Sequence, residues 1–336
     1  MTVRIGLIGA GRAGMIHGRN FAFQVFGSQV IAVCDSDEDL CNAAKAELGL
    51  SDVFTEYRKL VAISEIDAVV IATPTRLHQE IAVAAAQCGK HIFCEKPMAM
   101  TAEECDKINS AAAAAKVKLQ IGFMRRFAPA FQDLRRRIDG GEIGDVVSVR
   151  SITYGPSHPQ PWMYDLRMSN GPLAEVNSHD IDTVRWLTGS EITEVYAIAG
   201  NFRSHRARHE FPDYYDNVLM IAKLANGMQG LISGAQGVGY GYDARCEVLG
   251  TKGIAFAGGL AALPVACCNE FGLVSPVVKS WRELFAEAYR AEDQEFIRCI
   301  LADEPPRVTG EDGKRAVQVV NAGNESIFSG LPIKLL

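Results

Sequence analysis

The sequence lacks the features that mark zinc proteins, disulfide scaffolds, membrane proteins and secreted precursors. Its nine cysteines form no C-x-x-C pair, which favours reduced thiols in a cytoplasmic protein over a zinc or disulfide framework. No stretch approaches the roughly 20 apolar residues of a membrane span, so we expect no membrane partner. The first apolar run ends in glycines and Arg12 instead of a small-residue cleavage site, which argues against a signal peptide.

An excess of positive charge is also missing. With 34 Lys and Arg residues against 40 Asp and Glu residues, the net charge is −6 and the pI is about 5.7. That balance argues against a polyanionic ligand, and we expect no nucleic-acid partner. What the chain does have is 336 residues with 48% hydrophobic content, which suits two globular domains.

A glycine-rich turn follows the first predicted strand, residues 3–8. Residues 9–14 are Gly-Ala-Gly-Arg-Ala-Gly, a G-x-G-x-x-G motif that opens a predicted helix. The first glycine permits a tight turn, the second lets the backbone approach a pyrophosphate, and the third lets the helix pack closely. The N–H groups of the helix N-terminus would then face the phosphates. We therefore predict that a dinucleotide binds at Gly9, Gly11, Arg12, Ala13 and Gly14.

An acidic residue after the second predicted strand, residues 30–34, indicates which dinucleotide binds. Asp35 lies 21 residues after Gly14, close to the roughly 20 expected of a ribose-binding carboxylate. A carboxylate accepts hydrogen bonds from both ribose hydroxyls of NAD but repels the 2′-phosphate of NADP. No basic residue lies in the segment 35–39, so NAD is the predicted cofactor. Asp37 is predicted to be the N-cap of the next helix.

The alternation of strands and helices continues to about residue 121. After a third predicted strand at 67–72, Thr73 and Pro74 are predicted to line the cofactor, although the plain start of a helix would look the same. His78, in the first turn of that helix, either touches the cofactor or is exposed.

The segment His-Ile-Phe-Cys-Glu-Lys-Pro at 91–97 places a charged pair where open α/β sheets bind their ligands. Its apolar strand ends directly before Glu95 and Lys96, so both residues lie at the carboxyl end of a strand. Pro97 restricts the backbone of the preceding residue and helps to fix where Lys96 points. We predict that Glu95 and Lys96 belong to the cofactor site; a solvated ion pair at an ordinary strand exit is the alternative.

Beyond Gly122 the pattern of the sequence changes. Strand-like segments follow one another with few helices between them, at about 145–154, 192–201, 214–224, 228–236 and 244–250. This pattern predicts an α+β domain with a large, mostly antiparallel open sheet after an α/β Rossmann domain. Amphipathic helices are expected at about 279–302 and 311–329. The predicted domains are residues 1–122 and 123–336.

A candidate general base lies between the first two of those strands. His179 is near the start of an apparent helix that runs to Gly189, and Glu175 precedes it by four residues. If that turn is helical, the two side chains share a face. Histidine titrates near neutral pH and can accept the proton that leaves a hydroxyl; a capping or buried structural histidine is the alternative. Asp180 and Asp182 are predicted to be ordinary acids of the helix start.

Taken together, these motifs resemble the Gfo/Idh/MocA oxidoreductases, a family that includes glucose–fructose oxidoreductase and the inositol dehydrogenases. The resemblance rests on the glycine motif, on Glu95-Lys96-Pro97, on the segment 179–182 and on residues 122–127, Gly-Phe-Met-Arg-Arg-Phe. Two later segments are particularly similar to inositol dehydrogenases, residues 239–243 and 250–253. The motifs in this order span essentially the whole chain.

The resemblance implies an NAD-dependent dehydrogenase that oxidises a secondary hydroxyl of a polyol or cyclic sugar by direct hydride transfer, without a metal. The family's lysine matches Lys96, which would hydrogen-bond the reacting hydroxyl, and its histidine matches His179, the expected base. The acid four residues before that histidine is usually aspartate, but it is Glu175 here. The longer side chain moves the carboxylate, so this departure bears on the substrate more than on the chemistry.

The resemblance also leaves alternatives open. One branch of the family consists of sugar-responsive regulators that keep the fold without the chemistry, and other members would act on a dihydrodiol or a nucleotide sugar. Three aromatic side chains either contact the substrate or pack locally: Trp162, Tyr164 and Tyr240. Arg126 is a further substrate candidate with a structural alternative. Because family members associate through the open face of the second sheet, we expect a homodimer or a homotetramer.

Overall fold

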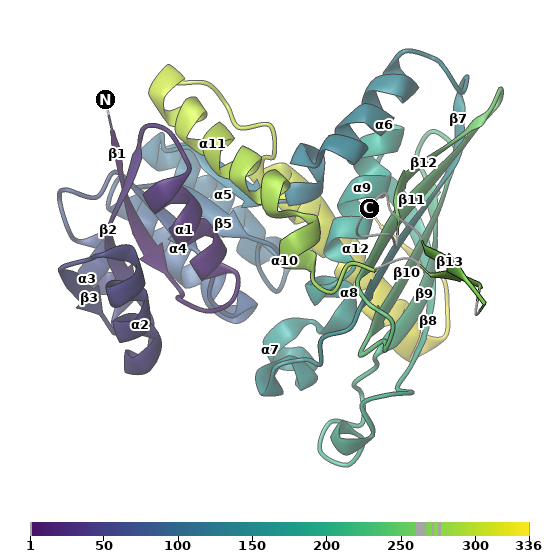
Figure 1. The fold of residues 1–336 in the computed structure, drawn as a ribbon, viewed down its shortest axis with the longest axis horizontal. Helices are drawn as coiled ribbons and strands as arrows, with labels where there is room; N and C mark the ends of the chain where they lie inside the picture. The colour runs from purple at the N-terminus through teal and green to yellow at the C-terminus, as the bar shows by residue number, and fades with distance from the viewer. Residues whose placement is uncertain (1, 260–266, 271, 275–276, 336) are drawn as a thin grey trace. The chain divides into compact units, whose positions relative to one another are not determined.

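The chain forms two compact units in the computed structural model (Figure 1). The structure describes residues 2–259, 267–270, 272–274 and 277–335. The units are Met1–Met124 with Glu287–Val317, and Arg125–Ala286 with Gln318–Leu336. The domains predicted from the sequence divide the chain once, after residue 122. The structure differs because residues 287–317 return to the first unit.

Six parallel strands form the sheet of the first unit, in the order β3-β2-β1-β4-β5-β6. The strands are β1 (Val3–Ile8), β2 (Ser28–Cys34), β3 (Asp52–Phe54), β4 (Ala68–Ile71), β5 (His91–Glu95) and β6 (Leu119–Gly122). Every residue of β4 is buried, as expected of a central strand covered on both faces. The sheet confirms the predicted Rossmann architecture.

The edge strand β3 is missing from the sequence prediction, which takes the strand at 67–72 as the third. β3 has three residues and none of them is fully buried. Only Val53 and Phe54 of these three residues are apolar, so the segment carries no apolar run long enough to reveal a strand.

Helices and short helical turns surround this sheet. They are α1 (Gly14–Phe23), α2 (Glu38–Leu48), α3 (Tyr57–Val61), η1 (Thr75–Leu77), α4 (His78–Gln87), α5 (Ala102–Ala115), α11 (Ala286–Ala302) and the first part of α12 (Gly310–Ser329). Asp37 caps α2 as predicted, because its carboxylate accepts from the N–H groups of Asp39 and Leu40.

Helix α11 completes the core of the first unit. Phe296 and Ile297 are fully buried in one apolar cluster with Ile5, Phe21 and Phe93, which come from β1, α1 and β5. Sequence order alone assigns this late helix to the second domain, whereas its apolar face belongs to the first.

A seven-stranded sheet forms the second unit, in the order β12-β11-β7-β10-β9-β8-β15. The strands are β7 (Val146–Gly155), β8 (Ile192–Gly200), β9 (Asn217–Leu224), β10 (Gln229–Gln236), β11 (Asp243–Gly250), β12 (Ile254–Gly258) and β15 (Ile333–Lys334). Among the described strands of this sheet, only β7 and β10 pair in parallel, so the predicted mostly antiparallel sheet is confirmed. A separate pair consists of β13 (Cys267–Asn269) and β14 (Gly272–Val274).

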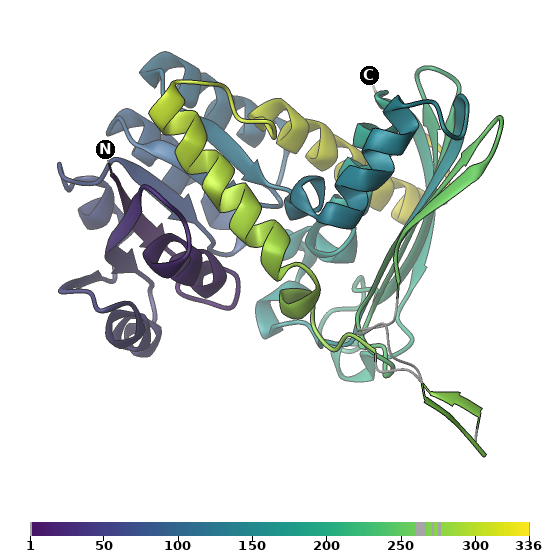
Figure 2. The same ribbon diagram turned by 45° about the horizontal axis from the view of Figure 1, so that its top comes forward.

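The helical elements of the second unit are η2 (Met124–Phe127), α6 (Pro129–Asp139), η3 (Pro161–Tyr164), α7 (Leu166–Ser169), α8 (Gly171–Glu175), α9 (Ser178–Thr188), η4 (His205–Ala207), α10 (Trp281–Leu284) and the second part of α12. Among them, α6, α8 and α9 pack on one face of this sheet (Figure 2). Buried and exposed residues alternate along most of β9, as expected when helices cover only one sheet face.

Two further predictions concern helices. The helix expected at about 279–302 is interrupted, because α10 ends at Leu284 and α11 begins at Ala286. Among the residues that the structure describes, no helix is both long and apolar enough to cross a membrane.

Candidate active site

The glycine motif forms the tight turn that the sequence predicts. Gly9 has a φ of +97°, and a Cβ atom there would lie 2.5 Å from the carbonyl oxygen of Ala72. At Gly14, a Cβ atom would lie 1.8 Å from the carbonyl oxygen of Gly9. Gly11 differs, because a Cβ atom there would meet no atom of the described chain within 4 Å. The backbone at Gly11 therefore borders open space, which is what a close approach by a pyrophosphate requires.

The residues around this turn suit the rest of a dinucleotide. Arg12 is exposed, Ala13 is half-buried, and both directly precede the N-terminus of α1. Asp35 accepts from the Ala10 N–H at 2.7 Å through Oδ2 and from the Asp37 N–H at 3.0 Å through Oδ1. Because a carboxylate can accept about four hydrogen bonds, Asp35 keeps capacity for ribose hydroxyls.

Thr73 and Pro74 follow the end of β4, as predicted. The Thr73 hydroxyl is buried and has no hydrogen-bond partner within the described part of the chain. An orphaned hydroxyl beside an open glycine backbone and a half-free carboxylate fits a ligand rich in hydroxyls and phosphates. The residues of the first unit therefore fit NAD.

His78 is buried, so of its two predicted environments the exposed one is wrong. It is only 1% exposed, and its ring lies between two backbone carbonyls. Nδ1 is 2.8 Å from the oxygen of Pro97 and Nε2 is 2.9 Å from the oxygen of Thr73. Burial lowers the pKa of His78, which favours the neutral ring. The ring thus connects two strand ends and is not a solvent-exposed residue.

Glu95 and Lys96 lie at the carboxyl end of β5, but they do not form a solvated pair. The Glu95 carboxylate is 5% exposed and accepts from the Lys96 backbone N–H at 2.9 Å through Oε2. Its Oε1 lies 3.0 Å from Nε2 of His17. A Cβ atom at Gly122 would lie 3.1 Å from the carboxyl carbon of Glu95, so the glycine leaves the room that this carboxylate occupies. Lys96 is half-buried.

His17 belongs to a cluster of buried ionisable groups that the sequence analysis does not predict. Its Nδ1 lies 2.7 Å from Oδ1 of Asp293, whose Oδ2 accepts from Asn20 at 2.7 Å. Burial opposes a charge on His17, but Asp293 and Glu95 outweigh it and hold the pKa of the imidazolium well above its ordinary value. For Glu95, burial acts to raise the pKa, but His17 outweighs it and leaves the pKa below the usual range.

Glu292 is the remaining member of this cluster, which we call the His17 cluster (His17, Glu95, Glu292 and Asp293). It is fully buried, and neither carboxyl oxygen has a hydrogen-bond partner among the residues that the structure describes. Burial raises the pKa of Glu292 well above its ordinary value, which favours the protonated, neutral carboxyl group. Ligand-type atoms of His17, Glu95 and Glu292 lie within 4.8 Å of one another.

One sequence signal points to His17. Gly14, His17, Gly18 and Phe21 are all buried and recur at the i, i+3, i+4, i+7 spacing of one helix face. A histidine on the inward face of the helix that follows the glycine motif must find a buried partner.

In the second unit, Glu175 and His179 flank a helix junction. Glu175 is half-buried and ends α8, whereas His179 is 5% exposed and lies in the first turn of α9. Val176 and Asn177 separate the two helices, so the pair does not lie on one continuous helix. The predicted end of the second helix is correct, because Gly189 follows Thr188 with a φ of +60°.

Asp180 is not the ordinary acid of a helix start that the sequence analysis expects. It is fully buried, and four side chains donate to its carboxylate. The donors are Arg125 at 2.7 Å, Ser151 at 2.6 Å, Thr153 at 2.7 Å and Asn177 at 2.8 Å. Arg125 is itself only 1% exposed, so this is a buried ion pair directly beside His179.

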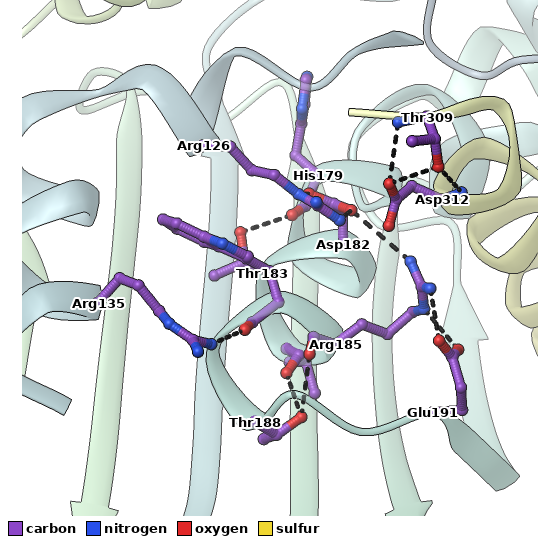
Figure 3. Close-up of polar contacts among 12 residues, drawn as sticks. Arg126, Arg135, His179, Asp182, Thr183, Arg185, Thr188, Glu191, Thr309 and Asp312 are labelled. Carbon is purple, nitrogen blue, oxygen red and sulfur yellow. Dashed lines mark hydrogen bonds and ion pairs between the residues drawn. The ribbon is translucent and has the colours of Figure 1, made fainter. Parts of the chain in front are cut away.

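Asp182 is also buried and paired with arginine, and is not a solvated acid (Figure 3). The Arg126 guanidinium donates to both its oxygens, with Nε at 2.9 Å and Nη2 at 2.6 Å. Arg185 lies 3.7 Å from Asp182 and forms a bidentate pair with Glu191. Arg126, a predicted substrate residue, is thus paired with a buried carboxylate.

The three aromatic candidates differ in their surroundings. Tyr164 stacks on Phe211 and meets Tyr214 edge-on, with ring centroids 6.1 and 4.9 Å apart. Tyr240 is 43% exposed and donates to Asp243 at 3.1 Å. Trp162 is half-buried in η3. Tyr164 thus packs locally, whereas Tyr240 keeps an accessible ring.

Comparisons with known proteins agree with this architecture. Residues 3–123 match the model of an oxidoreductase family with an NAD-binding Rossmann fold, and residues 131–256 match the GFO/IDH/MocA C-terminal domain. The chain is 32% identical to the myo-inositol 2-dehydrogenase of Thermotoga maritima, and the match covers 99% of this chain and 98% of that one. It is 33% identical to the scyllo-inositol 2-dehydrogenase (NAD(+)) of Bacillus subtilis, covering 99% and 96%.

A solved structure resembles the whole chain. The scyllo-inositol dehydrogenase of Lactobacillus casei, crystallised with NAD(H) and scyllo-inositol, has a TM-score of 0.91 and 28% identity, and the match covers 99% of both chains. Both sheets of the present chain therefore have counterparts in an experimental structure.

Proposed function

The chain belongs to the Gfo/Idh/MocA family of NAD-binding oxidoreductases, and from that premise we propose that it oxidises a secondary hydroxyl of an inositol or a similar cyclic polyol to a ketone. Membership confirms the predicted family, the predicted oxidoreductase class and the predicted NAD cofactor. The observation that carries the proposal is the match, over 99% of the chain, to proteins named as inositol 2-dehydrogenases.

We propose that the glycine motif and Asp35 bind NAD⁺. When bound, NAD⁺ supplies the hydride acceptor. Gly9, Gly11, Gly14 and Asp35 would hold it through the open backbone of the turn and the ribose carboxylate.

Lys96 would donate a hydrogen bond to the reacting hydroxyl, and His179 would accept its proton. A neutral histidine suits this role because its ordinary pKa lies near neutral pH. Glu175 would contact a neighbouring hydroxyl, with Tyr240 as a further contact.

Turnover by the purified protein tests this proposal directly. NADH absorbance is measured with NAD⁺ or NADP⁺ and a panel of myo-inositol, scyllo-inositol and aldoses. We expect NAD⁺ reduction with at least one inositol, and a loss of turnover of about 100-fold or more in Lys96→Ala and His179→Ala. NADH binding, followed by fluorescence, should persist in both variants.

Matched controls separate chemistry from folding. Lys107→Ala and His209→Ala remove exposed side chains of the same two types, one in each unit, and should turn over normally. Near-normal turnover in Lys96→Ala or His179→Ala would refute the assigned roles. Tight NADH binding without turnover on any compound would favour a dinucleotide-binding regulator instead.

We also infer that a second copy of the chain covers the exposed face of the second sheet. Two cross-strand pairs of apolar residues lie on that face, Tyr196 with Ile221 and Ile198 with Leu219. Their exposed fractions range from 37% to 57%, which is high for neighbouring apolar side chains. Light scattering should give a dimer or a tetramer, and Ile221→Glu should lower the mass. A monomeric wild-type protein would refute this inference.

A further inference from the structure

Two buried histidines hold the segment Glu95-Lys96-Pro97 from opposite ends. His17 contacts the side chain of the residue before Lys96, because its Nε2 lies 3.0 Å from Oε1 of Glu95. His78 contacts the residue after it, because its Nδ1 lies 2.8 Å from the carbonyl oxygen of Pro97. The two rings are 0% and 1% exposed, so neither can touch a substrate directly.

Each contact passes directly to the backbone of Lys96. Glu95 uses its second oxygen, Oε2, to accept from the Lys96 N–H at 2.9 Å. His17, Glu95 and the Lys96 amide therefore form an uninterrupted chain of hydrogen bonds. On the other side, the Pro97 carbonyl is one residue from Lys96. The neutral His78 ring lies between this carbonyl and that of Thr73 at the end of β4, and its single N–H can donate to one of the two.

Each ring is itself anchored to the scaffold of the first unit. Asp293 on α11 fixes the orientation of His17 through Nδ1, and Phe93 and Tyr289 pack beside the ring at 4.7 and 5.5 Å between centroids. His17 also belongs to α1, the helix whose N-terminus follows the glycine motif. The position of the Lys96 backbone is thus tied to the helix that begins at the glycine motif.

We propose that His17 and His78 are positioning residues for Lys96, acting through Glu95 and through the Pro97 carbonyl. A lysine side chain is long and flexible, so the placement of its backbone decides where the ammonium group can reach. Displacements of about 1 Å in such a group can cost about 100-fold in rate. The inference rests on the proposed function only in taking Lys96 as the residue that contacts the substrate.

The His17 cluster also has three groups that could ligate a metal ion. A protonated His17 accounts for the close approach of these groups better than a metal ion does, because both of its ring nitrogens already lie at hydrogen-bond distance from carboxylates. A cation would have to break the contact to Glu95 that also supports the Lys96 amide.

Asparagine and glutamine substitutions separate the two contacts of each ring. The amide nitrogen of Asn is as many bonds from Cα as Nδ1 of His, and that of Gln as many as Nε2. His17→Gln can therefore keep the contact to Glu95, whereas His17→Asn keeps only that to Asp293. For His78 the order reverses, because His78→Asn keeps the contact to Pro97 and His78→Gln keeps only that to Thr73.

The expected result is a crossed pattern in the turnover number. His17→Asn and His78→Gln should lose about 10- to 100-fold in kcat, while His17→Gln and His78→Asn stay within about 5-fold of the wild type. The Kd for NADH should change little in all four. Asn20→Ala is the matched control, because Asn20 lies on the same helix and donates to the same Asp293 without touching Glu95.

A second readout does not depend on activity. Lysines are methylated with ¹³C-formaldehyde, and the NMR signal of Lys96 is assigned by its absence in Lys96→Arg. His17→Asn and His78→Gln should shift that signal, whereas Asn20→Ala should not. If the wild-type protein turns over no compound, the proposed function fails, and the NMR pattern still tests the positioning role.

Two results would overturn the proposal. One is a set of losses in kcat and of NMR shifts that follows the unfolding temperature of the variants instead of the crossed pattern. The other is a metal ion at one equivalent per chain in the wild type, by elemental analysis, that is lost in His17→Asn.

Discussion

Each proposed catalytic residue has a buried carboxylate as its neighbour in the chain, but the two carboxylates are held differently. Glu95 precedes Lys96 in the first unit, and Asp180 follows His179 in the second. The partner of Asp180 is an arginine that stays charged at any pH the protein meets, whereas the partner of Glu95 is a histidine.

The two sites also differ in how completely their carboxylates are hydrogen-bonded. Four donors satisfy the Asp180 carboxylate, and all of them are buried. In the His17 cluster, one ring serves two carboxylates, and Glu292 has no hydrogen-bond partner within the described residues. The residue beside His179 therefore belongs to an ion pair that stays charged. The residue beside Lys96 belongs to a cluster whose contacts depend on which of its groups are protonated.

The largest expected effect comes from breaking the permanent pair. Asp180→Ala leaves the Arg125 guanidinium buried without its counter-charge, so the free energy of unfolding should fall by about 3–5 kcal/mol in a urea titration. The double variant Arg125→Met/Asp180→Leu should recover part of the loss, and Asp213→Ala, at an exposed site, should cost under about 0.5 kcal/mol. A loss below about 1 kcal/mol for Asp180→Ala would contradict the comparison.

A smaller effect is expected at the histidine-held carboxylate. Glu95→Gln removes the charge that His17 contacts, but His17 keeps Asp293 and the Lys96 N–H keeps an amide oxygen. The free energy of unfolding should fall by about 1.5–3 kcal/mol, less than for Asp180→Ala. Glu103→Gln, at an exposed site on α5, serves as the control. Equal losses at Glu95 and Asp180 would remove the distinction between the two sites.

The raised pKa of Glu292 predicts that replacing this residue by glutamine stabilises the protein above its ordinary titration range. Burial raises the pKa of Glu292, with Glu95 and Asp293 acting in the same direction and His17 against them. Below pH 4.5, folded and unfolded chains both carry the proton; as the pH rises, the unfolded chain releases it before the folded chain does, so stability declines.

Glu292→Gln removes that dependence. The unfolding temperature of this variant should exceed that of the wild type at pH 8 and match it near pH 4. Glu287→Gln, on the exposed side of α11, should show no such trend. An unchanged difference between pH 4 and pH 8 would refute a protonated Glu292.

The smallest effect on stability is expected at the glycine motif. Gly11→Ala places its methyl group in open space, so the free energy of unfolding should change by less than about 0.5 kcal/mol while NADH binding weakens. In Gly14→Ala the added methyl group would collide with the Gly9 carbonyl, so both the free energy of unfolding and the affinity for NADH should fall. Fluorescence titration with NADH checks the pair, and normal binding by Gly11→Ala would argue against a pyrophosphate at this backbone.

The features that the sequence predicts correctly are those that depend on residues close together in the chain. The glycine motif, the Asp37 cap and the α9 terminus at Gly189 all depend on residues a few positions apart, and the structure has them as expected. The change from alternating helices to consecutive strands likewise predicts the two sheets.

The partners of buried polar groups follow no such pattern. Arg125 and Asp180 are 55 positions apart, and His17 and Asp293 are 276 apart. Spacing near a helix start is the same for a solvated acid and a buried one, so the sequence predicts only ordinary helix-start acids at Asp180 and Asp182. The position of Glu175 relative to His179 could not be predicted either, because whether α8 and α9 form one helix depends on the backbone at Val176 and Asn177.

The return of residues 287–317 to the first unit sets an order of events during synthesis. A ribosome makes the glycine motif and β1 first, but Asp293 and Phe296 emerge only after the whole seven-stranded sheet except β15. Until then His17 has no α11 carboxylate to bind, and the apolar surface around Phe93 has no helix to cover it. The unit that is begun first is therefore completed after most of the second, and the nascent chain must keep that surface from aggregating in the meantime.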